Sequence, residues 1–230
     1  MKYEILCGHG DTQEKRTFDY ENDESKRPMA LDVLLQAKAT TEPDLAFRYG
    51  CRNELCGVCT IEVNGEPRLA CRCRVSEGDE LGPLSTLPQL RDLVVERESI
   101  NKQLQRVSTP TPVDQQQAPS TEVSSLNRCI ECYGCLSGCP MHERNANEAP
   151  NEEQGFHYGN PYTLLKLRRA MLDPLRNEEE KQEILLKTAD LGLDSCLNCD
   201  GCKCQVGISL VDEVIEPLLG EAAAAALLGY

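Results

Sequence analysis

Cysteine is the residue that most constrains the fold of this chain. The 230 residues include 14 cysteines, and all except Cys7 and Cys73 belong to three short groups. Aromatic residues make up only 4% of the chain and tryptophan is absent, so small domains gain limited stability from packing alone. Cysteines that bind metal or form disulfides can supply the missing stabilisation. The spacing inside each group therefore indicates what kind of protein this is.

The first group joins a tight loop to a distant fourth cysteine. Cys51, Cys56 and Cys59 have the spacing C-x4-C-x2-C, and Cys71 follows after eleven intervening residues. Plant-type 2Fe-2S sites use such a loop and a remote fourth thiolate, with two thiolates on each iron. Zinc sites usually join two C-x2-C knuckles, so a zinc site or a set of disulfides fits this spacing less well. We predict a 2Fe-2S cluster on these four cysteines.

Residues beside this group also have expected roles. Gly50 and Gly57 allow the backbone to come close and to turn its N–H groups toward sulfur, which tunes the potential of a cluster. Cys73 lies two residues after Cys71, and we expect it to be a spare buried thiol. Cys7 is likewise expected in the core.

The second and third groups complement each other. The second group consists of Cys129, Cys132, Cys135 and Cys139, the last of which precedes a proline. Their spacing, C-x2-C-x2-C-x3-C-P, is the bacterial ferredoxin run, in which the first three thiolates bind one cubane and the fourth binds another. The missing ligands must come from elsewhere in the chain. The third group can supply them and consists of Cys196, Cys199, Cys202 and Cys204.

The N-terminal part of the sequence predicts a β-rich domain with one helix packed on it. Apolar residues recur at helical spacing after Pro28, whereas the neighbouring segments alternate or contain β-branched residues. The dipeptide Asn64-Gly65 is a strong signal for a two-residue hairpin turn. The predicted elements are a helix over 29–39 and strands over 2–7, 15–20, 60–63, 66–71 and 92–96.

The C-terminal part predicts a mainly helical domain beyond a linker. Residues 107–125 are rich in Pro, Gln, Ser and Thr, which is typical of a linker. Helices are expected over 162–172, 178–191 and 210–219. We therefore predict a 2Fe-2S domain over 1–106, the linker over 107–125, and a helical domain with two cubane-type clusters over 126–230.

Charge and motif content exclude several classes of protein. A formal net charge of -14 argues against direct binding to nucleic acid or anionic lipid. No signal peptide is visible and no apolar run approaches the ~20 residues that span a bilayer, so we expect a soluble, cytoplasmic chain. The sequence has no dinucleotide-binding fingerprint, P-loop or nucleophile elbow, and its histidines are scattered. We expect no catalytic residues in this chain.

The sequence with these three groups resembles the iron–sulfur subunits of succinate dehydrogenases and fumarate reductases. The resemblance covers nearly the whole chain and is carried by residues 51–57 (CRNELCG), by residues 68–71 (RLAC), and by the order of the three cysteine groups. It implies an α+β protein: a plant-type ferredoxin (β-grasp) domain followed by an all-α, bacterial-ferredoxin-like domain. It also implies that Cys204 completes the 4Fe-4S cluster of Cys129, Cys132 and Cys135. Cys139, Cys196 and Cys202 would then hold a third cluster.

Two departures from the family pattern concern the third cluster. The family usually has an aliphatic residue three positions after the first late cysteine, which leaves a 3Fe-4S cluster, whereas Cys199 occupies that position here. A fourth thiolate should retain a fourth iron and lower the potential, so we predict a 4Fe-4S cluster, with 3Fe-4S as the alternative. The spacing Cys202-Lys203-Cys204 is shorter than usual and lacks the following proline. Cys202 and Cys204 could therefore exchange roles.

A third departure concerns the electron acceptor. Family members that reduce quinone carry a Trp shortly after the Cys-Pro pair, where Met141, His142, Glu143 and Arg144 stand here. His142 could donate a hydrogen bond to an acceptor, but a histidine beside charged residues is more often solvated.

The resemblance implies partners, because a chain without flavin cannot oxidise an organic acid alone. The expected partners are an FAD-containing flavoprotein subunit and a membrane-anchor subunit or another acceptor, with the chain peripheral on the inner face of the cell membrane. The expected function is an electron relay between that FAD and quinone. An alternative is the same relay in a reductase that uses a thiol couple as carrier or acts on another enoate. An alternative of another class is a zinc-stabilised or disulfide-stapled binding module, which would be colourless.

Overall fold

The chain forms two compact units. The computed structural model describes residues 1–21, 27–105, 121–199 and 201–227. The first unit, here called the N-terminal unit, contains Met1–Glu96 and also the later segment Ile130–Ser137. The second, here called the helical unit, contains Arg97–Cys129 and Gly138–Tyr230. Part of the ferredoxin run therefore belongs to the N-terminal unit.

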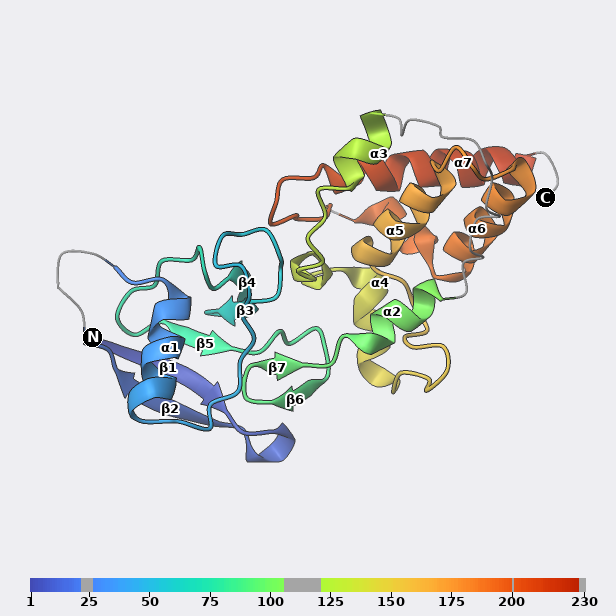
Figure 1. The fold of residues 1–230 in the computed structure, drawn as a ribbon. Helices are drawn as coiled ribbons and strands as arrows, with labels where there is room; N and C mark the ends of the chain where they lie inside the picture. The colour runs from blue at the N-terminus through green and yellow to red at the C-terminus, as the bar shows by residue number, and fades with distance from the viewer. Residues whose placement is uncertain (22–26, 106–120, 200, 228–230) are drawn as a thin grey trace. The chain divides into compact units, whose positions relative to one another are not determined.

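A five-stranded mixed sheet forms the framework of the N-terminal unit (Figure 1). Its strands in spatial order are β2 (Glu14–Asp19), β1 (Lys2–Cys7), β5 (Glu80–Gly82), β3 (Thr60–Val63) and β4 (Glu66–Leu69). Strand β5 runs parallel to β1, and the other neighbouring strands are antiparallel. The register pairs Tyr3 with Phe18 on one face, where both are buried, while Glu4 lies opposite Thr17. This alternation is what a sheet with one buried face requires.

Helix α1 (Ala30–Thr40) covers the buried face of this sheet. Its residues Leu31, Val33 and Leu34 are at most 3% exposed and share one hydrophobic core with Tyr3 and Ile5 of β1. The Asp32 carboxylate accepts the backbone N–H of Met29 at 3.3 Å and so caps the helix. A small hairpin of β6 (Gln89–Arg91) and β7 (Val94–Val95) completes the unit.

The expected α+β fold class is confirmed, with differences in detail. The helix and the strands expected at 2–7, 15–20 and 60–63 are present within one residue at each boundary. The strand expected over 92–96 is shorter because Asp92 has a left-handed backbone (φ +47°) that turns the hairpin. Strand β5 was not predicted, since its three residues carry too short a pattern. Cys7 lies in the core as expected.

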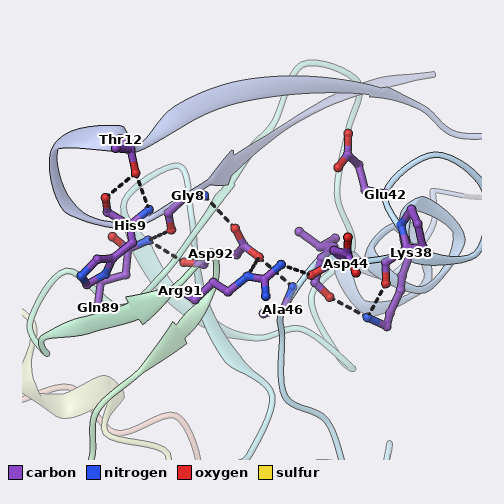
Figure 2. A network of polar contacts seen from close by, with 12 residues as sticks. Gly8, His9, Thr12, Lys38, Glu42, Asp44, Ala46, Gln89, Arg91 and Asp92 are labelled. Atoms are coloured by element: carbon purple, nitrogen blue, oxygen red, sulfur yellow. Dashed lines mark hydrogen bonds and ion pairs between the residues drawn. The ribbon is translucent and has the colours of Figure 1, made fainter.

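Asp92 joins three segments of the N-terminal unit (Figure 2). Its buried carboxylate accepts the backbone N–H groups of Gly8 at 2.7 Å and of Ala46 at 2.9 Å. The Asp92 N–H in turn donates to the Gly8 carbonyl at 2.7 Å. The exposed side chain of Arg91 lies 3.4 Å from the same carboxylate and donates to the Asp44 carbonyl. These hydrogen bonds of Asp92, here called the Asp92 brace, therefore fix the segment that leads into the first cysteine loop.

The helical unit is built from six α-helices in the described part of the chain (Figure 1). These are α2 (Glu98–Leu104), α3 (Thr121–Leu126), α4 (Pro140–Glu143), α5 (Pro161–Met171), α6 (Glu178–Asp190) and α7 (Glu216–Leu227). Asn160 and Asn177 cap α5 and α6, each accepting a backbone N–H at 2.9 Å. A π-helical turn, Val211–Ile215, leads into α7. The three helices expected in this region are thus present, the last beginning with that turn.

The predicted linker falls mostly outside the described residues. Residues 107–120 are not described, and the remaining part of the predicted linker belongs to α3. The domain boundaries at 106 and 126 remain predictions. Among the described residues, no helix is long and apolar enough to cross a membrane.

Candidate metal centres

The first cysteine loop directs backbone N–H groups at sulfur. The Cys51 sulfur accepts the N–H groups of Asn53 and Leu55, both at 3.3 Å, and the Cys56 sulfur accepts that of Cys51 at 3.5 Å. Arg52 and Glu54 take left-handed backbone conformations, with φ of +58° and +48°. Such a conformation turns successive N–H groups inward. These bonds lower the pKa of Cys51 to about 7, because they favour its thiolate.

The four predicted ligands of the first cluster lie together as two pairs. The Cys56 thiol influences the pKa of Cys51, and the Cys71 thiol influences that of Cys59, so each pair lies close together. Burial, with smaller contributions from the neighbouring Cys71 and Cys56 thiols, raises the pKa of Cys59 to about 11. A 2Fe-2S cluster requires two thiolates on each iron, so two neighbouring pairs suit its shape.

Helix α1 helps to hold the fourth member of this set. The backbone N–H of Leu31 donates to the Ala70 carbonyl at 3.0 Å, and that of Ala30 donates to the Cys73 carbonyl at 2.8 Å. The N–H groups of the first helical turn, which have no partner within the helix, thus bond carbonyls on either side of Cys71. An ion pair between Arg72 and Glu54, 2.9 Å apart, links this segment to the first loop.

The ferredoxin run has a similar backbone. Glu131 and Tyr133, which flank Cys132, have φ of +55° and +60°. Cys132 is buried and belongs to the hydrophobic core of the N-terminal unit, while Cys135 is partly exposed in the short helix η2 (Gly134–Leu136). Cys129 is the last residue of the first segment of the helical unit. The run therefore passes from one compact unit into the other.

Four cysteines of the helical unit are electrostatic neighbours. Burial, followed by the neighbouring thiols Cys139, Cys199 and Cys196, raises the pKa of Cys202 to about 12. Burial also raises the pKa of Cys196 to about 11, with Cys139 and Cys199 as the next causes. The pKa of Cys139 is raised by burial, against hydrogen bonds from the N–H groups of His142 and Met141. Cys199 thus lies with the three cysteines expected to hold the third cluster.

Arg144 connects the late cysteines to the Cys-Pro helix α4. Its guanidinium lies 3.8 Å from the centre of the Tyr158 ring and donates to the Ser195 hydroxyl at 3.3 Å. Ser195 precedes Cys196 in the short helix η4 (Leu193–Asn198). Arg144 therefore anchors the segment that carries Cys196. In the sequence, Arg144 stands out only as one of the residues found in place of Trp, and no local pattern signals this contact.

His142 is buried and not solvated. Its side chain is 5% exposed, packs edge-on against Phe156, and has its Nδ1 3.4 Å from the Asn145 amide nitrogen. The expectation of a solvated histidine is wrong because α4 turns this residue toward the interior of the helical unit. The charged neighbours Glu143 and Arg144 are the exposed residues of this segment.

In the described residues, no three His, Cys, Asp or Glu side chains converge closely enough to hold one metal ion. Ligands of a multi-iron cluster bind different irons and so lie further apart than ligands of one ion. The paired thiols with N–H donors at residues 51–71, and the four neighbouring thiols in the helical unit, are donor sets of the kind that iron–sulfur clusters use.

Comparisons with known proteins agree with this arrangement. Residues 4–102 match the family model described as a 2Fe-2S iron–sulfur cluster binding domain. The chain is 27% identical over 212 residues to a CoM/CoB fumarate reductase subunit of Methanothermobacter marburgensis, covering 86% of this chain and 39% of that protein. It is 25% identical over 228 residues to the succinate dehydrogenase iron–sulfur subunit of Bacillus subtilis, covering 89% and 86%.

The same fold occurs in a solved structure. A chain of the Mycobacterium smegmatis Sdh1 complex in the apo form matches with a TM-score of 0.80 and 24% identity, covering 97% of this chain and 95% of that one. The chain spans less than two fifths of the length of two of the curated relatives it matches, at 39% and 37%.

Proposed function

Since the chain belongs to the family of iron–sulfur subunits of succinate dehydrogenases and fumarate reductases, we propose that it relays electrons between the FAD of a flavoprotein subunit and an acceptor. The acceptor in the leading proposal is quinone, reached at or through a membrane-anchor subunit. The observation that carries the proposal is the grouping of the thiols, which matches the donor sets of a chain of clusters.

Three clusters are proposed, on three sets of thiolates. The first is a 2Fe-2S cluster on Cys51, Cys56, Cys59 and Cys71. The second is a 4Fe-4S cluster on Cys129, Cys132, Cys135 and Cys204. The third is a 4Fe-4S cluster on Cys139, Cys196, Cys199 and Cys202. The electrostatic influence of Cys199 on Cys196 and Cys202 supports including it, and the influence of Cys139 and Cys196 on Cys202 favours Cys202 over Cys204 for this set.

When bound, such clusters supply one-electron oxidation and reduction without bond breaking in the protein. The residues of this chain determine where and at what potential that happens. The N–H groups of Asn53 and Leu55 at the Cys51 sulfur stabilise the added negative charge of a reduced state. The burial of Cys139 shields this ligand of the third site from water. Backbone N–H donors raise a potential, whereas a fourth thiolate on a buried site lowers it.

The proposed fourth thiolate on the third cluster bears on the choice of acceptor. A lower potential there would reduce the driving force for delivering electrons to a quinone. The residues after Cys139-Pro140 offer no indole N–H, and Arg144 is already engaged by Tyr158 and Ser195. One relative is named for CoM/CoB and not for a quinone. We therefore propose as a second candidate the same relay in a reductase that uses a non-quinone carrier, such as a thiol couple, or another enoate.

Low-temperature EPR with iron analysis tests the proposal. The protein should be purified without oxygen, measured as isolated and after stepwise reduction, and its iron counted on the same sample. We expect a 2Fe-2S signal, low-potential 4Fe-4S signals and about ten irons per chain. A 3Fe-4S signal in the unreduced protein, with about nine irons, would instead remove Cys199 from the ligand set and favour the quinone-linked relay. A colourless protein without iron would overturn the relay altogether.

A further inference from the structure

Gly57 lies so close to the backbone of another segment that there is no room for a side chain at this position. It lies between Cys56 and Cys59, with φ of +64°. A Cβ atom at this position would overlap the carbonyl oxygen of Ile130 and would lie 2.9 Å from the nitrogen and 3.0 Å from the Cα of Cys132. All of these atoms are backbone, so none can swing away as a side chain could. The first cysteine loop therefore lies directly on the backbone of the ferredoxin run.

The left-handed conformation alone does not explain a glycine here. Arg52 and Glu54, in the same loop, have positive φ angles and carry full side chains. Gly65 has a larger φ of +78°, yet a Cβ there would meet nothing within 4 Å. What distinguishes Gly57 is the absence of space, because real Cβ atoms do not approach backbone atoms within 3.0 Å. The position requires glycine for close approach.

Both sides of this contact are fixed by other interactions in the N-terminal unit. The Thr60 hydroxyl, which is buried, donates to the Gly57 carbonyl at 2.8 Å. Cys132 is 8% exposed within the hydrophobic core, and Ile130 packs against that core. The Thr60 hydrogen bond holds one backbone and packing in the core holds the other. A methyl group at residue 57 can therefore be accommodated only if the two backbones move apart.

We propose that Gly57 is a positioning residue that sets the distance between the first two clusters of the relay. It does so by letting the Cys56–Cys59 loop lie against Ile130–Cys132 with no side chain between them. The inference rests on the proposed function, since it presupposes a cluster on each loop. The step concerned is transfer of one electron, lost on one side of the contact and gained on the other, and no bond or proton changes place. The rate of electron transfer falls steeply as the distance between two clusters increases, so this contact controls the rate.

Comparison of Gly57→Ala with Gly65→Ala tests the proposal in the full-length protein. Both substitutions place a Cβ at a left-handed position of the same unit, but only the first one meets backbone atoms. The readout is the magnetic interaction between the two clusters, measured as the faster relaxation of the 2Fe-2S EPR signal once the second cluster is reduced. We expect Gly57→Ala to lose most of this enhancement while retaining the iron of both clusters. Gly65→Ala should keep the enhancement of the unmodified protein.

Ile130→Ala keeps the proposal testable if Gly57→Ala does not assemble its clusters. Removing this partly buried side chain weakens the packing of the ferredoxin run against the core without creating a clash. We therefore expect a partial loss of the relaxation enhancement of the 2Fe-2S signal. An unchanged enhancement in Gly57→Ala, or in Ile130→Ala should the first variant fail, would overturn the proposal while the relay stands. If the unmodified protein lacks either EPR signal, the relay and the positioning role fall together.

Discussion

The exposed start of the first cysteine loop, at Cys51, and the late cysteines of the helical unit surround their sulfur atoms in opposite ways. Cys51 is exposed and receives two backbone N–H groups, which lower its pKa to about 7. Cys196 and Cys202 are partly buried, and burial beside other thiols raises their pKa values to about 11 and 12. The backbone thus favours the thiolate at Cys51, whereas burial raises the pKa of Cys59 in the same loop to about 11. The late site becomes favourable only when a metal neutralises the charge of several buried thiolates.

This difference separates two ways of making a metal site. The Cys51 sulfur is stabilised by hydrogen bonds from backbone N–H groups of the same short loop. The late site depends on contacts between segments distant in the sequence, such as that of Arg144 with Ser195. We therefore expect loss of iron to disturb the structure of the late site more than that of the first site.

The largest expected effect comes from Cys199→Ile. This substitution removes the fourth thiolate from the late site, so the third cluster should become 3Fe-4S, with loss of about one iron per chain. EPR of the unreduced protein should then show a 3Fe-4S signal that the unmodified protein lacks. Cys73→Val is the matched control, because Cys73 is also partly buried but lies outside the proposed ligand sets. Equal iron contents in the two variants would remove Cys199 from the site.

The second prediction compares thiol reactivity in the chain stripped of iron under reducing conditions. The thiolate is the reactive form, so Cys51 should be alkylated more than ~100-fold faster than Cys196 or Cys202 at neutral pH. The rate at Cys51 should rise from pH 6 to 8 and then level off, because its pKa is about 7. The rates at the two late cysteines should keep rising toward pH 11, near their raised pKa values.

Mass spectrometry of peptides after timed exposure to iodoacetamide measures these rates. Chain unfolded in urea serves as the reference, in which all three cysteines should react alike. Similar rates in the folded chain would show that the two regions do not differ in the way described.

The third prediction concerns the hydrogen bonds of the Asp92 carboxylate, which hold the segment before the first cysteine loop. Asp92→Asn keeps the size of the side chain and tolerates the left-handed backbone, but it replaces one acceptor oxygen by an NH2 group facing an N–H. Leaving a buried donor unpaired should destabilise the N-terminal unit by about 1–3 kcal/mol. Thermal unfolding measures this loss. Asp44→Asn makes the same chemical change on an exposed residue and should alter stability by no more than about 0.5 kcal/mol.

The smallest expected effect is at Arg144. Arg144→Met keeps much of the packing on Tyr158 but removes the charge and the hydrogen bond to Ser195, which should cost about 1 kcal/mol. Thermal unfolding and the loss of iron from the third cluster during dilution can both be followed. Arg169→Met, on a partly exposed face of α5, is the control. A larger loss of stability at residue 169 than at residue 144 would contradict the anchoring role.

The sequence was informative where function depends on local spacing. The C-x4-C-x2-C loop and the hairpin around Asn64-Gly65 are short-range patterns, and the predicted 2Fe-2S domain follows from them, whereas the fold class was implied by the family resemblance. Strand β5 could not be predicted, because its three residues are specified by pairing with β1 and β3, far away in the sequence. His142 was misjudged for a similar reason, since its burial depends on the direction of α4 and on Phe156, and not on the charge of the adjacent residues.

Roles that depend on the space around a residue also could not be predicted from the sequence. Gly57 was expected to let the backbone come close and turn N–H groups toward sulfur, but the sequence could not indicate that the backbone it approaches is that of Ile130 and Cys132. Asp92 and Arg144 appear in the sequence as ordinary charged residues, and their partners are 84 and 51 positions away. Such contacts are set by the folded backbone and leave no periodic signal.

The presence of Ile130–Ser137 in the N-terminal unit has a consequence for how the protein is made. During synthesis, the first 96 residues emerge from the ribosome before the segment that completes their hydrophobic core, which includes Cys132. Domains usually fold as units from the N-terminus onward, but the core of this one is complete only once residues 130–137 have been made. A fragment that ends before that residue would leave part of its core uncovered, so the two halves of this chain should be expressed as one polypeptide.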